Sequence, residues 1–314
     1  FKQKTAYEIM PSLVGSEMCI RDSIHIVKKI KIATRRSPLA IRQAEYVKKE
    51  LIRNHSDIEI QIVRILTEGD RFLDAPLFDI VGKGLFIKEL EEALLSKNAD
   101  IAVHSMKDVI VELPKGLEIS VIMKREDSRD VLISNQYNSI AEIPDNSTVG
   151  TSSLRRQSQL KQVNSNILFE GLRGNVETRI GKLDDGKYDA IILAAAGIIR
   201  LGLAERITEF ISFSHVLPAV GQGAIGIECR TNDETTQQLI APLNDKDTSL
   251  CVLTERAFSR RLNGGCQLPI ASHAVIENNQ IKVDGLVARL DGSKVIRLQK
   301  IGELEDADKI GSSL

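Results

Sequence analysis

Cysteine, aromatic residues and net charge are all scarce in this chain. It has no tryptophan, and its formal charge at pH 7 is only −1 because 42 Lys and Arg nearly balance 43 Asp and Glu. A nucleic-acid-binding protein normally carries a strongly basic domain or stripe, so the balance argues against that class. No apolar run is long enough to span a membrane, so no membrane partner is expected either. Any positive charge used for binding must therefore be local.

The few cysteines have no spacing typical of a metal site. They are Cys19, Cys229, Cys251 and Cys266, and none forms a CxxC pair. Because no secretory signal is evident, they are interpreted as the reduced thiols of a cytoplasmic protein. The sequence predicts no metal.

Length and composition are ordinary for a globular protein. A chain of 314 residues with 42% hydrophobic and 27% charged residues has room for two or three domains. Residues 1–23 are different, because they show neither a helical nor a strand period and lack the apolar core of a signal peptide. They resemble translated sequencing-adapter read-through, and we expect a non-native tail there.

From Ile30 onward, strand and helix patterns alternate. Residues 30–33 read as a strand, and Ser37 then caps a helix opened by Pro38. A strand follows at 58–62, a helix at 89–95 and another strand at 100–103. Such alternation predicts a parallel α/β sheet whose ligand site lies at the carboxyl ends of the strands.

A long loop interrupts this first unit. Residues 67–84 carry three glycines and a proline among charged residues, a composition and length typical of a lid. Asp70 and Lys83 are the candidate lid residues.

The same pattern restarts at Val149. The hydroxyls of Thr151, Ser152 and Ser153 are placed to cap a helix N-terminus, which favours an anion. Arginines recur at the predicted strand ends and in the helices after them: Arg35, Arg155, Arg156, Arg173, Arg179 and Arg200. The planar guanidinium matches a carboxylate bidentately, so this set predicts a carboxylate-binding cleft. The alternative is a scatter of surface arginines.

A glycine pair precedes Cys266. Gly264 and Gly265 permit a tight loop, and the turn before Pro269 would hold the Cys266 thiol outward for use. The alternative is an ordinary buried cysteine after a turn.

Two further patterns have competing interpretations. Residues 221–226 match a dinucleotide fingerprint, but Pro218 precedes them and 224–229 alternate as a strand, so no such cofactor is expected. His104 has the chemistry of a general base, although a structural histidine is the better interpretation on an apolar strand.

Seven short blocks, in order, resemble the porphobilinogen deaminase family, whose enzymes are also called hydroxymethylbilane synthases. They are ATR (33–35), VGKGLF (81–86), HSMKD (104–108), VGTSSLRR (149–156), LRGN (172–175), LPAVGQG (217–223) and GGCQ (264–267). The resemblance runs from Ile30 to the end of the sequence.

This resemblance implies an α/β fold of three domains. Two would resemble the lobes of type II periplasmic binding proteins, and the third would be a small α+β domain. We expect domain 1 at 24–123 and 224–241, domain 2 at 129–217, and domain 3 at 246–314. Because the family's third domain continues through a helix, domain 3 is expected to be incomplete here.

The resemblance also implies an activity in tetrapyrrole, including heme, biosynthesis. A dipyrromethane cofactor would be held on Cys266 by a thioether. Four molecules of the substrate porphobilinogen would be joined head to tail with loss of ammonia, and hydrolysis would release the product. A cytoplasmic monomer is expected.

Roles for individual residues follow from the matching blocks. Asp108 corresponds to the catalytic aspartate, which would stabilise the cation left when ammonia departs. Predicted cofactor-binding residues are Ser105, Lys107, Asp108, Thr151, Ser153, Arg155, Arg156, Arg173 and Arg179. Predicted substrate-binding residues are Arg35, Ser37, Phe86, Arg173, Arg179, Arg200 and Gln222. Ile110 departs from the family, which commonly has proline there.

Two other classes remain as rivals. A periplasmic-type binding protein would share the lobes but would need a secretory signal and has no use for the Cys266 loop. A nucleotide-dependent oxidoreductase would need the glycine fingerprint between a strand and a helix.

Overall fold

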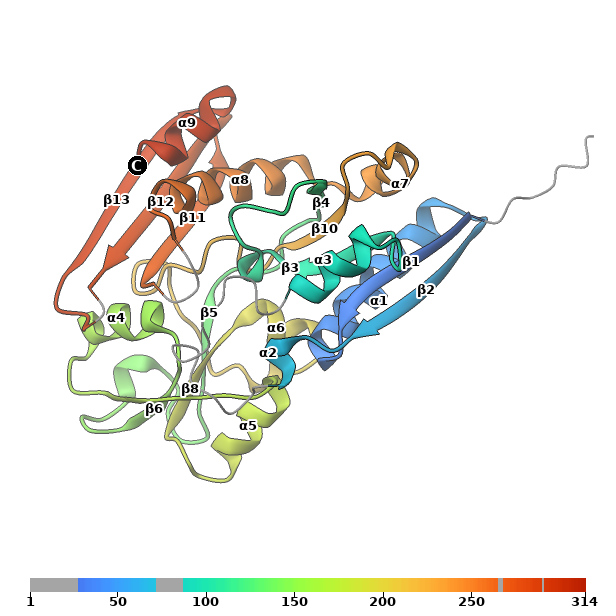
Figure 1. Ribbon diagram of the computed structural model, residues 1–314. Coiled ribbons are helices and arrows are strands. Elements are labelled where there is room, and N and C mark those ends of the chain that lie inside the picture. Colours follow the sequence, from blue (N-terminus) through green and yellow to red (C-terminus); the bar gives the residue numbers. More distant parts are fainter. Residues whose placement is uncertain (1–27, 72–86, 265–267, 290) are drawn as a thin grey trace, which may run out of the picture.

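The computed structural model describes residues 28–71, 87–264, 268–289 and 291–314. Three β-sheets with helices packed on them make up this part of the protein (Figure 1). The first sheet and its helices form one lobe, the second sheet and its helices a second lobe, and the third sheet lies beside both at the upper left of the view. The α/β fold with a small third sheet is thus confirmed.

The first sheet has the strand order β2-β1-β3-β10-β4. Its strands are β1 (Lys28–Arg35), β2 (Ile58–Ile65), β3 (Ile101–Ser105), β4 (Leu117–Ile122) and β10 (Ile225–Arg230). β1 pairs in parallel with β2 and β3, so the carboxyl ends of β1 and β3 meet at one edge. This edge is where the alternating pattern predicts the ligand site.

Helix α1 (Pro38–Asn54) shows why the local sequence folds as expected. Ser37 Oγ accepts a hydrogen bond from Ala40 N at the helix start, and Pro38 occupies the first turn. The apolar stripe through Ala44, Val47 and Leu51 is fully buried against the sheet. Helix α3 (Lys88–Leu95) follows the predicted 89–95 segment within one residue.

The second sheet has the order β7-β6-β8-β5-β9. Its strands are β5 (Asp130–Ile133), β6 (Thr148–Gly150), β7 (Leu168–Glu170), β8 (Ala190–Ala194) and β9 (Glu209–Phe210). Helices α4 (Leu154–Val163), α5 (Val176–Asp184) and α6 (Ala195–Arg200) follow β6, β7 and β8, respectively. β6 is parallel to both β7 and β8, so their carboxyl ends also share an edge.

These two sheets are mainly parallel, as the alternating pattern predicts, but each contains one oppositely directed strand. β5 is antiparallel to β8, and β10 is antiparallel to β3 and β4. The reason is the path of the chain, which leaves the first lobe after β4 and returns after β9, and these passages insert one oppositely directed strand into each sheet.

The third sheet is an antiparallel meander, β11 (Ile270–Glu277), β12 (Gln280–Ala288) and β13 (Val295–Glu303). Helices α8 (Lys246–Arg261) and α9 (Ala307–Ser312) pack on it, and α7 (Glu234–Ile240) precedes them. On β13, the side chains of Ile296, Leu298 and Ile301 are about half exposed.

The predicted lid loop begins with a short helix, α2 (Glu68–Arg71), because Asp70 Oδ2 accepts from the backbone N and the hydroxyl of Thr67 and so caps a turn. The rest of the loop, with Lys83, and the expected tail at 1–23 lie outside the described residues. None of the described helices combines the length and apolarity that a membrane crossing would require.

Candidate functional site

A pocket lies where β1 and β3 end. Its polar lining includes Arg35, Ser37, Gln43, Ser105 and Asp108. Gln43 is 3% exposed, and its Nε2 donates to Ser105 Oγ at 2.8 Å, which fixes the serine side chain. The structure therefore brings together four residues that the sequence analysis selected and adds Gln43 to them.

Asp108 sits in a short turn directly after β3. The backbone forms a 3-10 turn at Met106–Asp108, and Met106 N donates to Ala224 O at 3.0 Å. The Met106 side chain, 1% exposed, packs against Gly221 and Gly226, where any Cβ would collide with it. Gly221 and Gly226 thus make room for the turn.

The dinucleotide alternative fails on this geometry. The glycines lead into strand β10 rather than into a helix, as the sequence analysis expected.

Arg35 is paired with a lid candidate. Its Nη2 lies 2.5 Å from Asp70 Oδ1. Burial alone would raise the pKa of Asp70, but the hydrogen bond and the charge of Arg35 hold it below its usual range. A carboxylate ligand at Arg35 would therefore compete with Asp70 or share the guanidinium with it.

Arg155 and Arg156 converge on a buried carboxylate. Arg155 Nη1 donates to Asp130 Oδ2 at 2.7 Å and to Leu217 O at 2.6 Å. Arg156 donates to Asp130 Oδ1 from Nε and Nη2, and to Ile192 O from Nη1. Asp130 is 0% exposed, and although burial would raise its pKa, the two guanidiniums hold it far below the ordinary value. All three guanidinium nitrogens of Arg156, and Nη1 of Arg155, therefore donate hydrogen bonds inside the protein.

The hydroxyls before α4 act differently from the expectation. Ser153 is the N-cap residue, but its side chain makes no capping hydrogen bond. Thr151 Oγ1 instead accepts from Ser153 N at 3.2 Å, and Ser152 Oγ donates to Leu172 O at 3.1 Å. The hydroxyls thus tie the loop to itself and to the strand-end segment after β7.

A second group of charges faces Asp108. Burial, helped by the charges of Arg156 and Arg173 and opposed by Asp108, lowers the pKa of Arg179 to about 10. Burial also lowers the pKa of Lys107, which feels the charge of Asp108 as well. Asp108 therefore lies within electrostatic reach of cations from both lobes.

Gln222 and Arg200 lie where the chain returns to the first lobe. Gln222 is 1% exposed; its Nε2 donates to Ser128 O at 2.7 Å and to Asp130 Oδ1 at 3.0 Å. Gln222 Oε1 is buried and has no partner among the described residues. Arg200 Nη2 donates to Gly223 O at 2.7 Å.

His104 also lines the pocket and is largely buried. Its Nε2 lies 2.9 Å from Glu228 Oε2, as expected of a structural histidine. Glu91 on α3 faces the same pair. Burial and the charges of Glu228 and Glu92 raise the pKa of Glu91 to about 7, against the opposing effect of His104.

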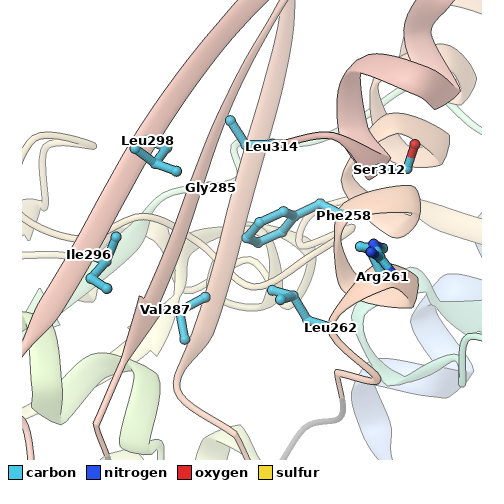
Figure 2. Close-up of a pocket in the computed structure, with 9 residues that line it drawn as sticks. All are labelled: Phe258, Arg261, Leu262, Gly285, Val287, Ile296, Leu298, Ser312 and Leu314. Carbon is cyan, nitrogen blue, oxygen red and sulfur yellow. The ribbon is translucent and has the colours of Figure 1, made fainter.

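A separate apolar pocket lies between the third sheet and helices α8 and α9 (Figure 2). Phe258, Leu298 and Leu314 point into it, and Arg261 contributes the charged group at its edge. It contains none of the predicted site residues and offers little polar chemistry.

Several site residues fall outside this description, and others were missed. Cys266 and Phe86 lie outside the described residues, as does Lys83. Asp130 was missed, although a charged residue opening the fully buried strand β5 is a signal of a paired charge. Within the described part of the chain, no group of three or more His, Cys, Asp or Glu side chains is arranged to hold a metal ion.

This geometry defines a class of protein: an α/β protein whose strand ends present cations to an anionic ligand. The match to family models narrows the class: residues 30–238 match porphobilinogen deaminase, dipyromethane cofactor binding domain, and residues 249–314 match porphobilinogen deaminase, C-terminal domain. The chain belongs to the porphobilinogen deaminase family. It accordingly polymerises porphobilinogen in tetrapyrrole biosynthesis, using a dipyrromethane cofactor.

Several solved structures have a similar chain path. A putative methionine-binding lipoprotein from Bacillus subtilis is 13% identical, with a TM-score of 0.42 over 76% of this chain and 96% of its own. Lipoprotein Tp32 from Treponema pallidum is 14% identical, with a TM-score of 0.44 over 69% and 90%. A periplasmic substrate-binding protein from Coxiella burnetii is 13% identical, with a TM-score of 0.44 over 70% and 94%. Likenesses at this level say nothing about function.

Proposed function

We propose that the chain is a hydroxymethylbilane synthase that joins four porphobilinogen molecules head to tail, releases one ammonia for each, and frees the tetrapyrrole by hydrolysis. It would work in heme biosynthesis as a cytoplasmic monomer, without nucleic acid, membrane or metal. The observation that carries the proposal is Asp108, held at the end of β3 in a pocket with Arg35 and within electrostatic reach of Lys107 and Arg179.

Asp108 is the proposed catalytic residue. Porphobilinogen becomes positively charged as its ammonia leaves, and a fixed carboxylate beside that charge stabilises it as it develops. The hydrogen bonds and packing that hold Met106 keep Asp108 in place, so little reorganisation is needed during the reaction. The same carboxylate would accept hydrogen bonds from the pyrrole N–H groups.

The donor set fits a dipyrromethane with several carboxylates. Arg173 and Arg179, with Lys107, would bind the cofactor carboxylates, and the remaining donors of Arg155 and Arg156 would support them. Gln222 Oε1, a buried acceptor without a described partner, suits an N–H donor. Ser105, Thr151 and Ser153 would add hydroxyl contacts. When bound, the dipyrromethane supplies the terminal pyrrole to which each new unit is joined.

Arg35, Ser37, Phe86, Arg200 and Gln222 would bind the incoming substrate, with Arg173 and Arg179 shared between the two roles. Asp70 and Lys83 would belong to a lid, and the Arg35–Asp70 ion pair supports that role for Asp70.

We propose three domains with the boundaries expected from the resemblance, 24–123 with 224–241, 129–217 and 246–314. The insertion of β10 between β3 and β4 supports the discontinuous first domain.

Cys266 is the proposed attachment point of the cofactor. The other described thiols are poor candidates because Cys229 and Cys251 are buried. Burial and the nearby Glu255 raise the pKa of Cys251 to about 12, and burial also raises that of Cys229, so neither forms a thiolate readily.

The test is intact-mass spectrometry of the purified chain and its cysteine variants. Wild-type protein, Cys229→Ala and Cys251→Ala should carry the mass of two porphobilinogen-derived units, and Cys266→Ala should carry none and be inactive. An active wild-type protein without an adduct would overturn the proposal, and an adduct that survives Cys266→Ala would move the attachment point.

A further inference from the structure

Arg256 connects α8, the helix packed on the third sheet, to the segment that follows Asp108. It lies on α8, and its guanidinium donates to three consecutive carbonyl oxygens just after Asp108. Arg256 Nη1 binds Val109 O at 3.0 Å, and Nη2 binds Ile110 O at 2.7 Å and Val111 O at 3.2 Å. We call residues 106–111 the Asp108 turn.

Arg256 is an unusual residue to bury for packing alone. It is 6% exposed, and no carboxylate among the described residues lies within ion-pair distance of it. Burial, helped by the charge of Arg260, lowers its pKa to about 10, which leaves it charged at neutral pH. An apolar side chain would fill the space without that desolvation cost, so the guanidinium has a use in binding the carbonyls.

Helix α8 is a firm support for this contact. Glu255, the residue before Arg256, is 0% exposed and accepts from Arg125 Nη1 at 2.6 Å, Gly221 N at 2.7 Å and Ala274 N at 2.9 Å. Glu255 therefore binds β11 and both segments that connect the lobes, and its neighbour Arg256 binds the Asp108 turn. In the sequence, Cys266 follows the end of this helix at Arg261 by five residues.

We propose that Arg256 is a positioning residue, which holds the Asp108 turn in register with the helix that precedes the cofactor-attachment loop. Met106 fixes the start of the turn through Ala224 O, and Arg256 fixes its end. This inference rests on the proposed catalytic role of Asp108. Without the Arg256 guanidinium, the Asp108 carboxylate would still be charged but would lose its alignment with the cofactor and substrate.

The experiment compares Arg256→Met, Arg256→Lys and the matched control Arg260→Met in the full chain. Arg260 lies on the same helix with a half-exposed side chain and a loose contact to Asp308. Each protein is assayed for kcat and KM of ammonia release, for adduct mass, and for amide hydrogen exchange, which reports on the turn whether or not the enzyme is active.

We expect Arg256→Met to lower kcat by roughly a hundredfold, the scale associated with a misplacement of about 1 Å, with KM changed less than about threefold. Exchange should accelerate in 106–111 and not in β5 or β8. Arg256→Lys should recover part of kcat because an ammonium still binds carbonyls, and Arg260→Met should match the wild type.

If Arg256→Met has the same kcat and the same amide hydrogen exchange as the wild type, the inference is overturned. Exchange that accelerates evenly over the molecule would also overturn it, because that result indicates a merely structural role. An absence of adduct from the wild type would refute the proposed function instead, while the exchange data would still test the contact.

Discussion

Replacing Asp130 with asparagine should strongly destabilise the protein. The carboxylate is 0% exposed and accepts three hydrogen bonds from Arg155 and Arg156 and one from Gln222. Asp130→Asn keeps the shape but leaves two guanidiniums, 5% and 7% exposed, without their counter-charge. Removing one partner of such a buried pair costs about 3–5 kcal/mol, a large part of a typical stability of about 5–15 kcal/mol.

The assay is urea unfolding of wild type, Asp130→Asn and the control Asp184→Asn. Asp184 pairs with Arg206 at 2.7 Å near the surface, where an ion pair contributes only about 0–1 kcal/mol. Because folding lowers the pKa of Asp130, its contribution is present above the unfolded pKa of about 3.9 and disappears as the pH falls toward the folded value. The difference between wild type and Asp130→Asn should therefore be constant from pH 5 to 8.

The cofactor provides a second arm of the test. If its carboxylates bind beside Arg155 and Arg156, they supply negative charge that partly replaces Asp130. The destabilisation should then be larger in the Cys266→Ala background than in loaded protein. A loss below about 1 kcal/mol, equal to that of Asp184→Asn, would refute the view of Asp130 as the main counter-charge.

Three further outcomes are expected. Asp108→Asn should reduce single-turnover ammonia release by roughly a hundredfold to a thousandfold, with Asp108→Glu intermediate, and an asparagine variant as active as the glutamate variant would remove charge from the mechanism. Arg35→Leu and Arg179→Leu should stall with different numbers of bound pyrroles by mass spectrometry, since each guanidinium meets different carboxylates; uniform weakening of every step would contradict this. Folding raises the pKa of Glu91 to about 7, so stability should fall by roughly 2–3 kcal/mol as the pH rises from 5 to 8. In Glu91→Gln, urea unfolding should lack this fall, and a variant with the wild-type slope between pH 5 and 8 would identify another group.

Local signals predicted much of the fold. Ser37 and Pro38 set the start of α1, and the apolar stripe of that helix is buried as its spacing requires. The strand-end positions also followed from sequence, because Thr151 comes directly after β6 and Asp108 lies three residues after the end of β3. These features depend on residues within a few positions of one another.

What the sequence could not predict depends on distant partners. Arg155 and Arg156 were expected to face a ligand, but their use by Asp130 depends on a pairing about 25 positions away that only the folded sheet creates. Likewise, the antiparallel entry of β10 follows from the route of the chain between the lobes, and Arg256 was missed because its acceptors are backbone carbonyls, which carry no sequence signal.

The late return of β10 has a consequence for biosynthesis. This strand fills the gap between β3 and β4, and its Glu228 meets His104 from 124 residues further along the chain. Until residues 225–230 have emerged from the ribosome, β3 and β4 must wait with unpaired edges, while the whole second lobe is made in the interval. Long-range closures of this kind are slow and leave unpaired strand edges exposed, so the nascent chain is prone to aggregate until β10, which follows the second lobe, has emerged.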